Sequence, residues 1–100
     1  MARYRILFWK EFPAQVKAQD EHGTASALLD DRFQQSIDAA AMAENSTDTD
    51  AYLDGWAWGP EQEHPGTANE VAEAVRAKLE AEFTTERLSE MVRIRKQDGA

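Results

Sequence analysis

Asp50-Ala-Tyr-Leu-Asp-Gly-Trp-Ala-Trp-Gly-Pro60 holds two of the three tryptophans and one of the two tyrosines of this 100-residue chain. The run is short enough to form a single strand, in which alternate side chains point to opposite faces. One face would be large and aromatic, with Tyr52, Asp54, Trp56 and Trp58. The other would be small, with Leu53, Gly55 and Ala57, and would let a helix approach the backbone closely. The stretch therefore predicts a central strand whose tryptophans form either a second packing surface or an exposed sheet face.

The residues before this stretch predict a β-hairpin. Residues 3–10 are rich in aromatic and β-branched side chains, and apolar residues occupy both odd and even positions, which is typical of an interior strand. Pro13 marks a turn or an edge, and residues 14–19 form a second, more polar strand anchored by Val16. A turn over residues 20–23 ends this strand, and we expect the two strands to pair.

A helix is predicted between the hairpin and the central stretch. Residues 26–31 lead into it, and Asp30 or Asp31 is a suitable N-cap for a helix that begins at Arg32. We expect Asn45 to close it in the left-handed conformation. Its inner face consists of Phe33, Ile37, Ala40, Ala41 and Glu44.

A second helix follows a loop over residues 61–66 and is opened by the capping box Thr67-Ala-Asn-Glu70. Its inner stripe consists of Val71, Val75, Lys78, Leu79 and Phe83. Arg76 and Glu80, four positions apart, can form a weak ion pair on its outer face. The tail, residues 84–100, fits either a helix or an edge strand, and we favour the helix.

These elements indicate an α+β fold in the order β-β-α-β-α. The sheet would be antiparallel, with the two main helices on one face and a helical tail. At 100 residues the chain has the length of one domain. We expect that domain to span residues 1–100, with its core over residues 3–83.

The net charge of −8 is unevenly distributed along the chain. Both ends carry a basic excess, whereas residues 18–83 hold fifteen acidic side chains and three basic ones. An acidic body repels phosphate backbones, so nucleic-acid binding is not expected. We interpret the acidic surface as a solvated face rather than a docking site for a basic partner.

The N-terminal segment is basic and then apolar, but its apolar run is four residues long and ends in Lys10-Glu11. It fits neither a signal peptide nor a membrane span. We therefore expect a cytoplasmic protein with no membrane partner.

Motifs of catalysis and cofactor binding do not occur in the sequence. It has no cysteine, no Gly-x-Ser-x-Gly, no Gly-x-Gly-x-x-Gly and no phosphate loop. Glu61, Glu63 and His64, with His22 from a distant turn, are of the right types to bind a divalent ion. We interpret them as a polar loop, because a site needs three or four ligands held by a second shell. The sequence predicts no catalytic residue, no metal and no cofactor, and it disfavours an enzyme.

The candidate binding residues are Trp9, Arg32, Trp56 and Trp58. Most aromatic side chains of so small a domain must pack in its core. Three tryptophans nevertheless exceed what a minimal core requires, and we hypothesise that Trp58 is presented with Trp9 at a partner surface. Arg32 either binds an anion or, as we prefer, pairs with Asp54 on the central strand.

Several short motifs together resemble one known family. They are Phe8-Trp9-Lys10, Pro13-Ala14-Gln15-Val16, Arg32-Phe33-Gln34, Ile37-Asp38, Ala41-Met42, Asp50-Ala-Tyr-Leu-Asp-Gly-Trp56 and Pro65-Gly66. The chain is similar, over about residues 4–83, to the small domain family labelled "virulence factor", which also occurs in the larger helical-repeat proteins called conserved virulence factor C. The resemblance implies an accessory protein and carries over no catalytic residue.

The function that these observations favour is a non-catalytic accessory or protein-interaction module, with a protein partner or a homodimer. The alternative is a small-ligand-binding protein or a minor subunit of an enzyme complex. Its aromatic pocket would be bounded by Trp56, Trp58, Arg32 and the His64 loop.

Overall fold

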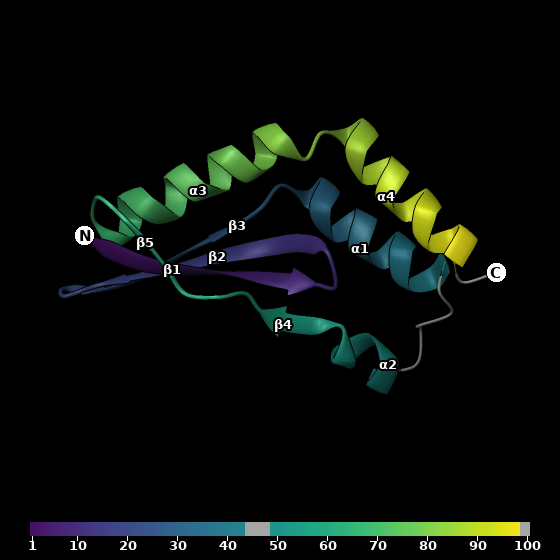
Figure 1. Cartoon of the computed structure of the whole chain (residues 1–100), viewed down its shortest axis with the longest axis horizontal. Coiled ribbons are helices and arrows are strands. Elements are labelled where there is room, and N and C mark those ends of the chain that lie inside the picture. Colours follow the sequence, from purple (N-terminus) through teal and green to yellow (C-terminus); the bar gives the residue numbers. More distant parts are fainter. Residues whose placement is uncertain (44–48, 99–100) are drawn as a thin grey trace.

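The sheet is built around the first strand of the chain (Figure 1). The computed structural model describes residues 1–43 and 49–98. The strands are β1 (Ala2–Trp9), β2 (Phe12–Asp20), β3 (Gly23–Leu28), β4 (Trp56–Trp58) and β5 (Gln62–His64). β1 pairs antiparallel with β2 on one side and with β4 and β5 on the other, and β3 pairs with β2. The predicted α+β class, the hairpin of the first two strands and the interior position of the first strand are therefore confirmed.

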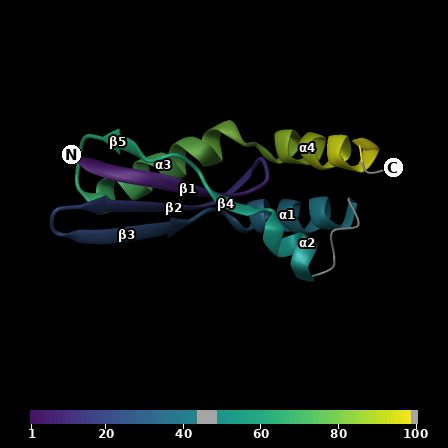
Figure 2. The same cartoon turned by 60° about the horizontal axis from the view of Figure 1, so that its bottom comes forward.

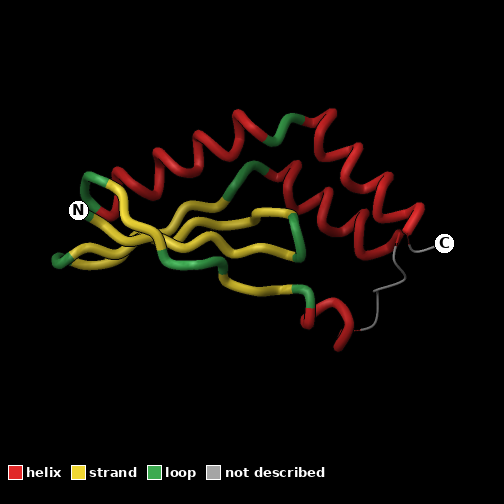
Figure 3. The backbone as a smooth tube through the Cα atoms, viewed as in Figure 1, coloured by secondary structure: helices red, strands yellow, loops and turns green. Residues whose placement is uncertain are grey.

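The three long helices lie on one side of this sheet and extend beyond its end, and a short helix lies beside β4 (Figure 1). The helices of the described residues are α1 (Asp31–Ala43), α2 (Thr49–Asp54), α3 (Ala68–Glu82) and α4 (Thr85–Asp98). α3 packs across β1, β2 and β3, while α1 and α4 lie side by side beyond the end of the strands (Figures 1 and 2). Figure 3 shows the three long helices gathered on one side of the strand layer, with α2 beside the end of β4. The helical reading of the tail is confirmed.

The central strand predicted over residues 50–60 is wrong for its first half. The chain forms the short helix α2 there, and only Trp56–Trp58 is extended. Trp9 explains the change, because its indole N–H donates to the main-chain oxygen of Tyr52 at 2.8 Å and its ring stacks on the Tyr52 ring at 5.9 Å. Gly55 then passes so close to the indole that a Cβ would overlap it. A tertiary contact thus decides the backbone of a stretch whose sequence favours a strand.

Two further strands, β3 and β5, lie where a lead-in and a loop were expected. Asp20 accepts hydrogen bonds through Oδ1 from the backbone N–H groups of His22 at 2.7 Å and Gly23 at 3.0 Å, and the chain turns back as β3. Residues 62–64 form β5 because they reach the open edge of β1, where Gln62 pairs with Tyr4. The order β-β-β-α-α-β-β-α-α therefore contains more elements than the five predicted before the tail.

Asp20 also ties this turn to the helix layer. Its Oδ2 accepts a hydrogen bond from the backbone N–H of Ala68, the first residue of α3, at 2.7 Å. That bond, followed by those from His22 and Gly23, holds the pKa of the Asp20 carboxyl below its usual value of 3.8. The predicted capping box of α3 is confirmed next to it. The backbone N–H of Thr67, with its hydroxyl, lowers the pKa of Glu70.

Most of the core lies between the helix-covered face of the sheet and the long helices, and Trp9 packs against Tyr52 of α2. The largest fully buried side chains include Trp9, Phe12, Phe33, Ile37, Leu88, Val16 and Val71. The inner faces predicted for the two main helices are confirmed at Phe33, Ile37, Ala40, Ala41, Val71, Val75 and Leu79. Lys78 is exposed, against expectation, and Phe83 is partly buried against Phe33. Glu44 and Asn45 lie outside the described residues.

Candidate functional site

The second face of the sheet carries a row of side chains that no helix covers. Directly opposed residues of an antiparallel sheet project to the same face. Leu7 of β1 is opposed by Trp58 of β4 and by Gln15 of β2, and Gln15 is opposed by Leu28 of β3. Trp58 is 45% exposed and Leu28 is 74% exposed, while Leu7 is half-buried. An apolar row thus crosses the sheet from edge to edge, interrupted only by Gln15.

Positive side chains occupy the next rows of the same face. Arg5 of β1 lies directly opposite Lys17 of β2, and Arg3 lies opposite Gln19. With Trp58 these residues border a shallow depression of about 270 Å³, which Glu61 also lines. Like charges that face each other across a sheet are destabilising, so this pair is an unusual feature of an acidic protein.

Carboxylates lie near only some of the positive side chains of this face. Arg3 approaches Glu61 at 4.0 Å, and both side chains are largely exposed. Glu63 of β5 lies opposite Arg3 on its other side. Within residues 1–43 and 49–98, neither Arg5 nor Lys17 forms an ion pair. The carboxylates therefore lie at the β5 end of the face, and the centre is positive.

The structure separates the two tryptophans that we expected to find together at a surface. Trp9 is fully buried, so the expectation of a surface shared with Trp58 is wrong for Trp9. Trp56 is half-buried and packs edge-on against Tyr52, with ring centroids 6.0 Å apart. Of the three indoles, only that of Trp58 is largely open to solvent.

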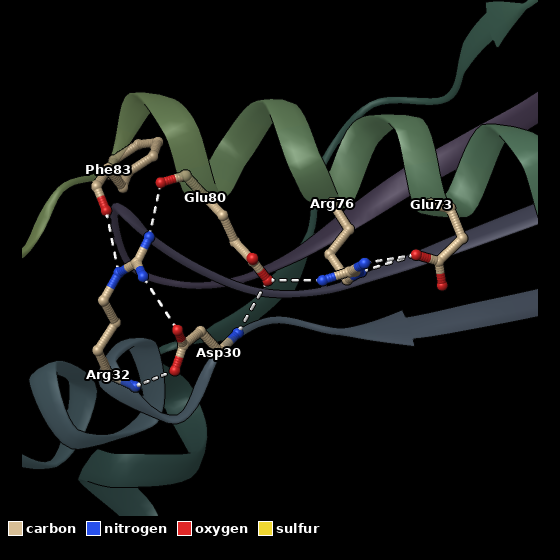
Figure 4. Close-up of polar contacts among 6 residues, drawn as sticks. All are labelled: Asp30, Arg32, Glu73, Arg76, Glu80 and Phe83. Carbon is tan, nitrogen blue, oxygen red and sulfur yellow. Dashed lines mark hydrogen bonds and ion pairs between the residues drawn. The ribbon is translucent and has the colours of Figure 1, made fainter.

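Arg32 is engaged by main-chain oxygens rather than by Asp54, which corrects the predicted pair (Figure 4). Its guanidinium donates to the main-chain oxygens of Glu80 at 2.6 Å and Phe83 at 3.4 Å, and to the Asp30 carboxylate at 3.0 Å. The last carbonyl groups of a helix have no partner within the helix. Arg32 therefore caps the C-terminal end of α3 from the first turn of α1, which is a structural role.

A chain of ion pairs continues from this point along α3 (Figure 4). Glu80 accepts from the backbone N–H of Asp30 at 3.2 Å and from Arg76 at 3.1 Å, so the predicted Arg76–Glu80 pair is confirmed. Arg76 also pairs with Glu73, and these two carboxylates, Glu73 first, raise the pKa of the guanidinium. The chain fastens α3 to the segment that joins β3 to α1.

The pocket expected between Trp56, Trp58, Arg32 and the His64 loop is not assembled. Trp58 borders the depression on the open sheet face, Arg32 borders a hollow between α1 and α4, and His64 borders one between β1 and α3. Among the described residues, no group of three or more His, Asp or Glu side chains is placed to hold a metal ion. In the same part of the chain, no helix combines the length and apolarity needed to cross a bilayer.

The open face was not predicted, because β3 was not among the expected strands. A signal was present in Gly23-Thr-Ala-Ser-Ala-Leu28, where small apolar and polar residues alternate directly after a turn. With that strand in place, Leu28 and Lys17 would have joined Trp58 on one face.

Comparison with known proteins gives one match. A family model with the description "Virulence factor" matches residues 7–92. No curated protein and no solved structure matches the chain.

Proposed function

The chain belongs to the virulence factor family, and from that premise we propose that it is a non-catalytic accessory module that binds a protein partner through the open face of its sheet. We define this face by Trp58, Leu7, Leu28, Arg3, Arg5 and Lys17. The proposal also includes the cytoplasmic setting expected from the sequence.

The observation that carries the proposal is the exposure of Trp58 within an apolar row. A tryptophan that is 45% exposed beside Leu7, and in line with Leu28 at 74%, leaves a large apolar area in water. Exposed apolar groups that are rimmed by polar residues mark interaction sites. Tryptophan and arginine are also the residues that most often dominate the binding energy of protein interfaces.

A small ligand is the second candidate, and the depression beside Trp58 is the observation that favours it. Its volume of about 270 Å³ lies just under the range of roughly 300–1,000 Å³ typical of ligand pockets. Arg3, Arg5 and Lys17 at its border are exposed, so a bound molecule would stay mostly in water. A shallow, exposed depression of this kind is better suited to binding a protein than to binding a small molecule.

Affinity capture from a lysate of the source organism tests the proposal. The bait is the wild-type protein, Trp58→Ala, or Leu53→Ala as a matched control, because Leu53 is 57% exposed but lies on α2 and is not one of the strand residues that define the open face. Circular dichroism first establishes that all three are folded. We expect a protein that is retained by the wild type and by Leu53→Ala and is lost with Trp58→Ala. Equal capture by all three baits would overturn the proposal, and a metabolite that raises Tm of the wild type but not of Trp58→Ala would favour the second candidate.

A further inference from the structure

We propose that the open face binds an acidic segment of its partner, in extended conformation, with an apolar residue and an Asp or Glu two positions apart. The inference rests on the proposed function, because it names the partner chemistry of the same face.

The first step is the charge at the centre of the face. Arg5 and Lys17 are exposed, oppose each other directly and have no ion pair within the described residues. Placing two cations side by side costs stability, and the surrounding protein has a net charge of −8. A carboxylate bound between them would relieve their repulsion. Charge complementarity therefore selects an anionic group at this position.

The second step is the spacing between the two kinds of row. Leu7 and Arg5 are two residues apart on β1, and Gln15 and Lys17 are two residues apart on β2. Two residues of a strand span about 7 Å. A segment that lies extended along the strands projects alternate side chains with the same spacing. An apolar side chain seated between Trp58 and Leu7 would thus place the side chain two positions away over Arg5 and Lys17.

The third step separates this partner from other anions and from a second copy of the chain. A nucleic acid carries its charge along its whole length and would meet the acidic remainder of the protein. Face-to-face pairing of two copies about a two-fold axis through the positive centre would bring Arg5 and Lys17 of one copy near the same cations of the other. A short acidic segment avoids both kinds of repulsion. Glu61 and Glu63 lie at the β5 end of the face and would repel the segment's carboxylates there. The negative charge of the segment would therefore bind at the positive centre.

Fluorescein-labelled peptides test the inference by anisotropy. One peptide repeats Leu-Thr-Glu-Thr, a second repeats Leu-Thr-Gln-Thr, and a third, Leu-Glu-Thr-Thr, places the two side chains on opposite faces. We expect the first to bind most tightly, with an affinity that falls as salt is raised. Arg5→Gln and Lys17→Gln should each weaken its binding about two- to fivefold, the size expected for an exposed ion pair. Arg93→Gln, an exposed arginine on α4, serves as the control and should leave the affinity unchanged.

Each contrary result has a distinct meaning. Equal binding of the glutamate and glutamine peptides, or equal binding of both glutamate spacings, would overturn the inference. So would tighter binding of single-stranded DNA than of the acidic peptide, or a wild-type dimer in sedimentation that Lys17→Gln abolishes. If the captured partner is lost with Trp58→Ala but retained by the Arg5 and Lys17 variants, the interaction module stands and only the acidic partner is refuted. If capture does not depend on Trp58, the proposed function fails as well.

Discussion

The guanidinium of Arg32, in the first turn of α1, donates to the main-chain oxygen of Glu80, in the last turn of α3, at 2.6 Å. One side chain thus joins the start of one helix to the end of another that lies 48 positions later in the sequence. The contact thereby holds the start of α1 against the C-terminal end of α3.

Arg32→Met should lower the free energy of unfolding by about 1–3 kcal/mol. It leaves main-chain oxygens of Glu80 and Phe83 without their charged donor, and hydrogen bonds to charged groups are among the stronger ones. Arg32→Lys should recover only part of the loss, because an ammonium cannot reproduce the planar fork of donors. Urea denaturation measures both. Arg93→Met, which removes an exposed pair with Glu90, is the control, and a similar loss there would refute the capping role.

Gly55→Ala should destabilise the protein by about 1–3 kcal/mol, the usual cost of overpacking. A Cβ at this position would lie 2.7 and 2.9 Å from two carbon atoms of the Trp9 indole. In a Trp9→Leu background the added cost should largely disappear, because the overlapping ring is gone. A double-mutant cycle by thermal or urea unfolding measures the coupling. Additive effects would show that Gly55 is required for another reason.

Asp20 should contribute to the pH dependence of stability in acid. Its folded pKa is lowered by N–H donors, of which Ala68 is the strongest. The contribution is therefore complete above the unfolded pKa, near 3.8, and is lost as the pH falls through the lowered folded pKa. Asp20→Asn should have a lower Tm at neutral pH and a shallower decline of Tm in acid. Part of the decline should persist, because the pKa of Glu70 is also lowered. If Tm of Asp20→Asn declined in acid as steeply as that of the wild type, the contribution of Asp20 to the pH dependence would be refuted.

Lys17→Gln should make the protein more stable while it weakens the proposed interaction. The substitution removes a cation that directly opposes Arg5, and opposed like charges cost roughly 0.2–1 kcal/mol. The gain should shrink as salt screens the repulsion. Urea denaturation at low and high salt measures it. A loss of stability at low salt would mean that Lys17 has a structural role.

Local signals in the sequence were sufficient for about half of the architecture. The apolar content of residues 3–10 predicts the interior strand, and the spacing from Thr67 to Glu70 predicts the capping box, because both patterns act within one element. The helices over Phe33–Ala41 and Val71–Leu79 follow from their periodic apolar faces in the same way.

The remaining features depend on contacts between distant residues. The helix at Tyr52 is fixed by the indole of Trp9, 43 positions earlier, and the partner of Arg32 is a pair of main-chain oxygens that no charge pattern reveals. Among the candidate binding residues, Trp58 is exposed as expected and Trp9 is not. Both are tryptophans in apolar stretches, so the sequence alone could not show which of them is buried. Arg5 and Lys17 became candidates only when the register placed them opposite each other.

The central position of β1 has a consequence for the newly made chain. β1 is synthesised first and can pair at once with β2, but its other edge is completed only by residues 56–64. Until then the nascent hairpin presents an open strand edge and the apolar indole of Trp9, both of which favour association with other chains. Pairings between residues so distant in sequence also form slowly. We therefore expect α3 and the completed sheet to form late in folding, and the nascent chain to depend on chaperones more than its small size suggests.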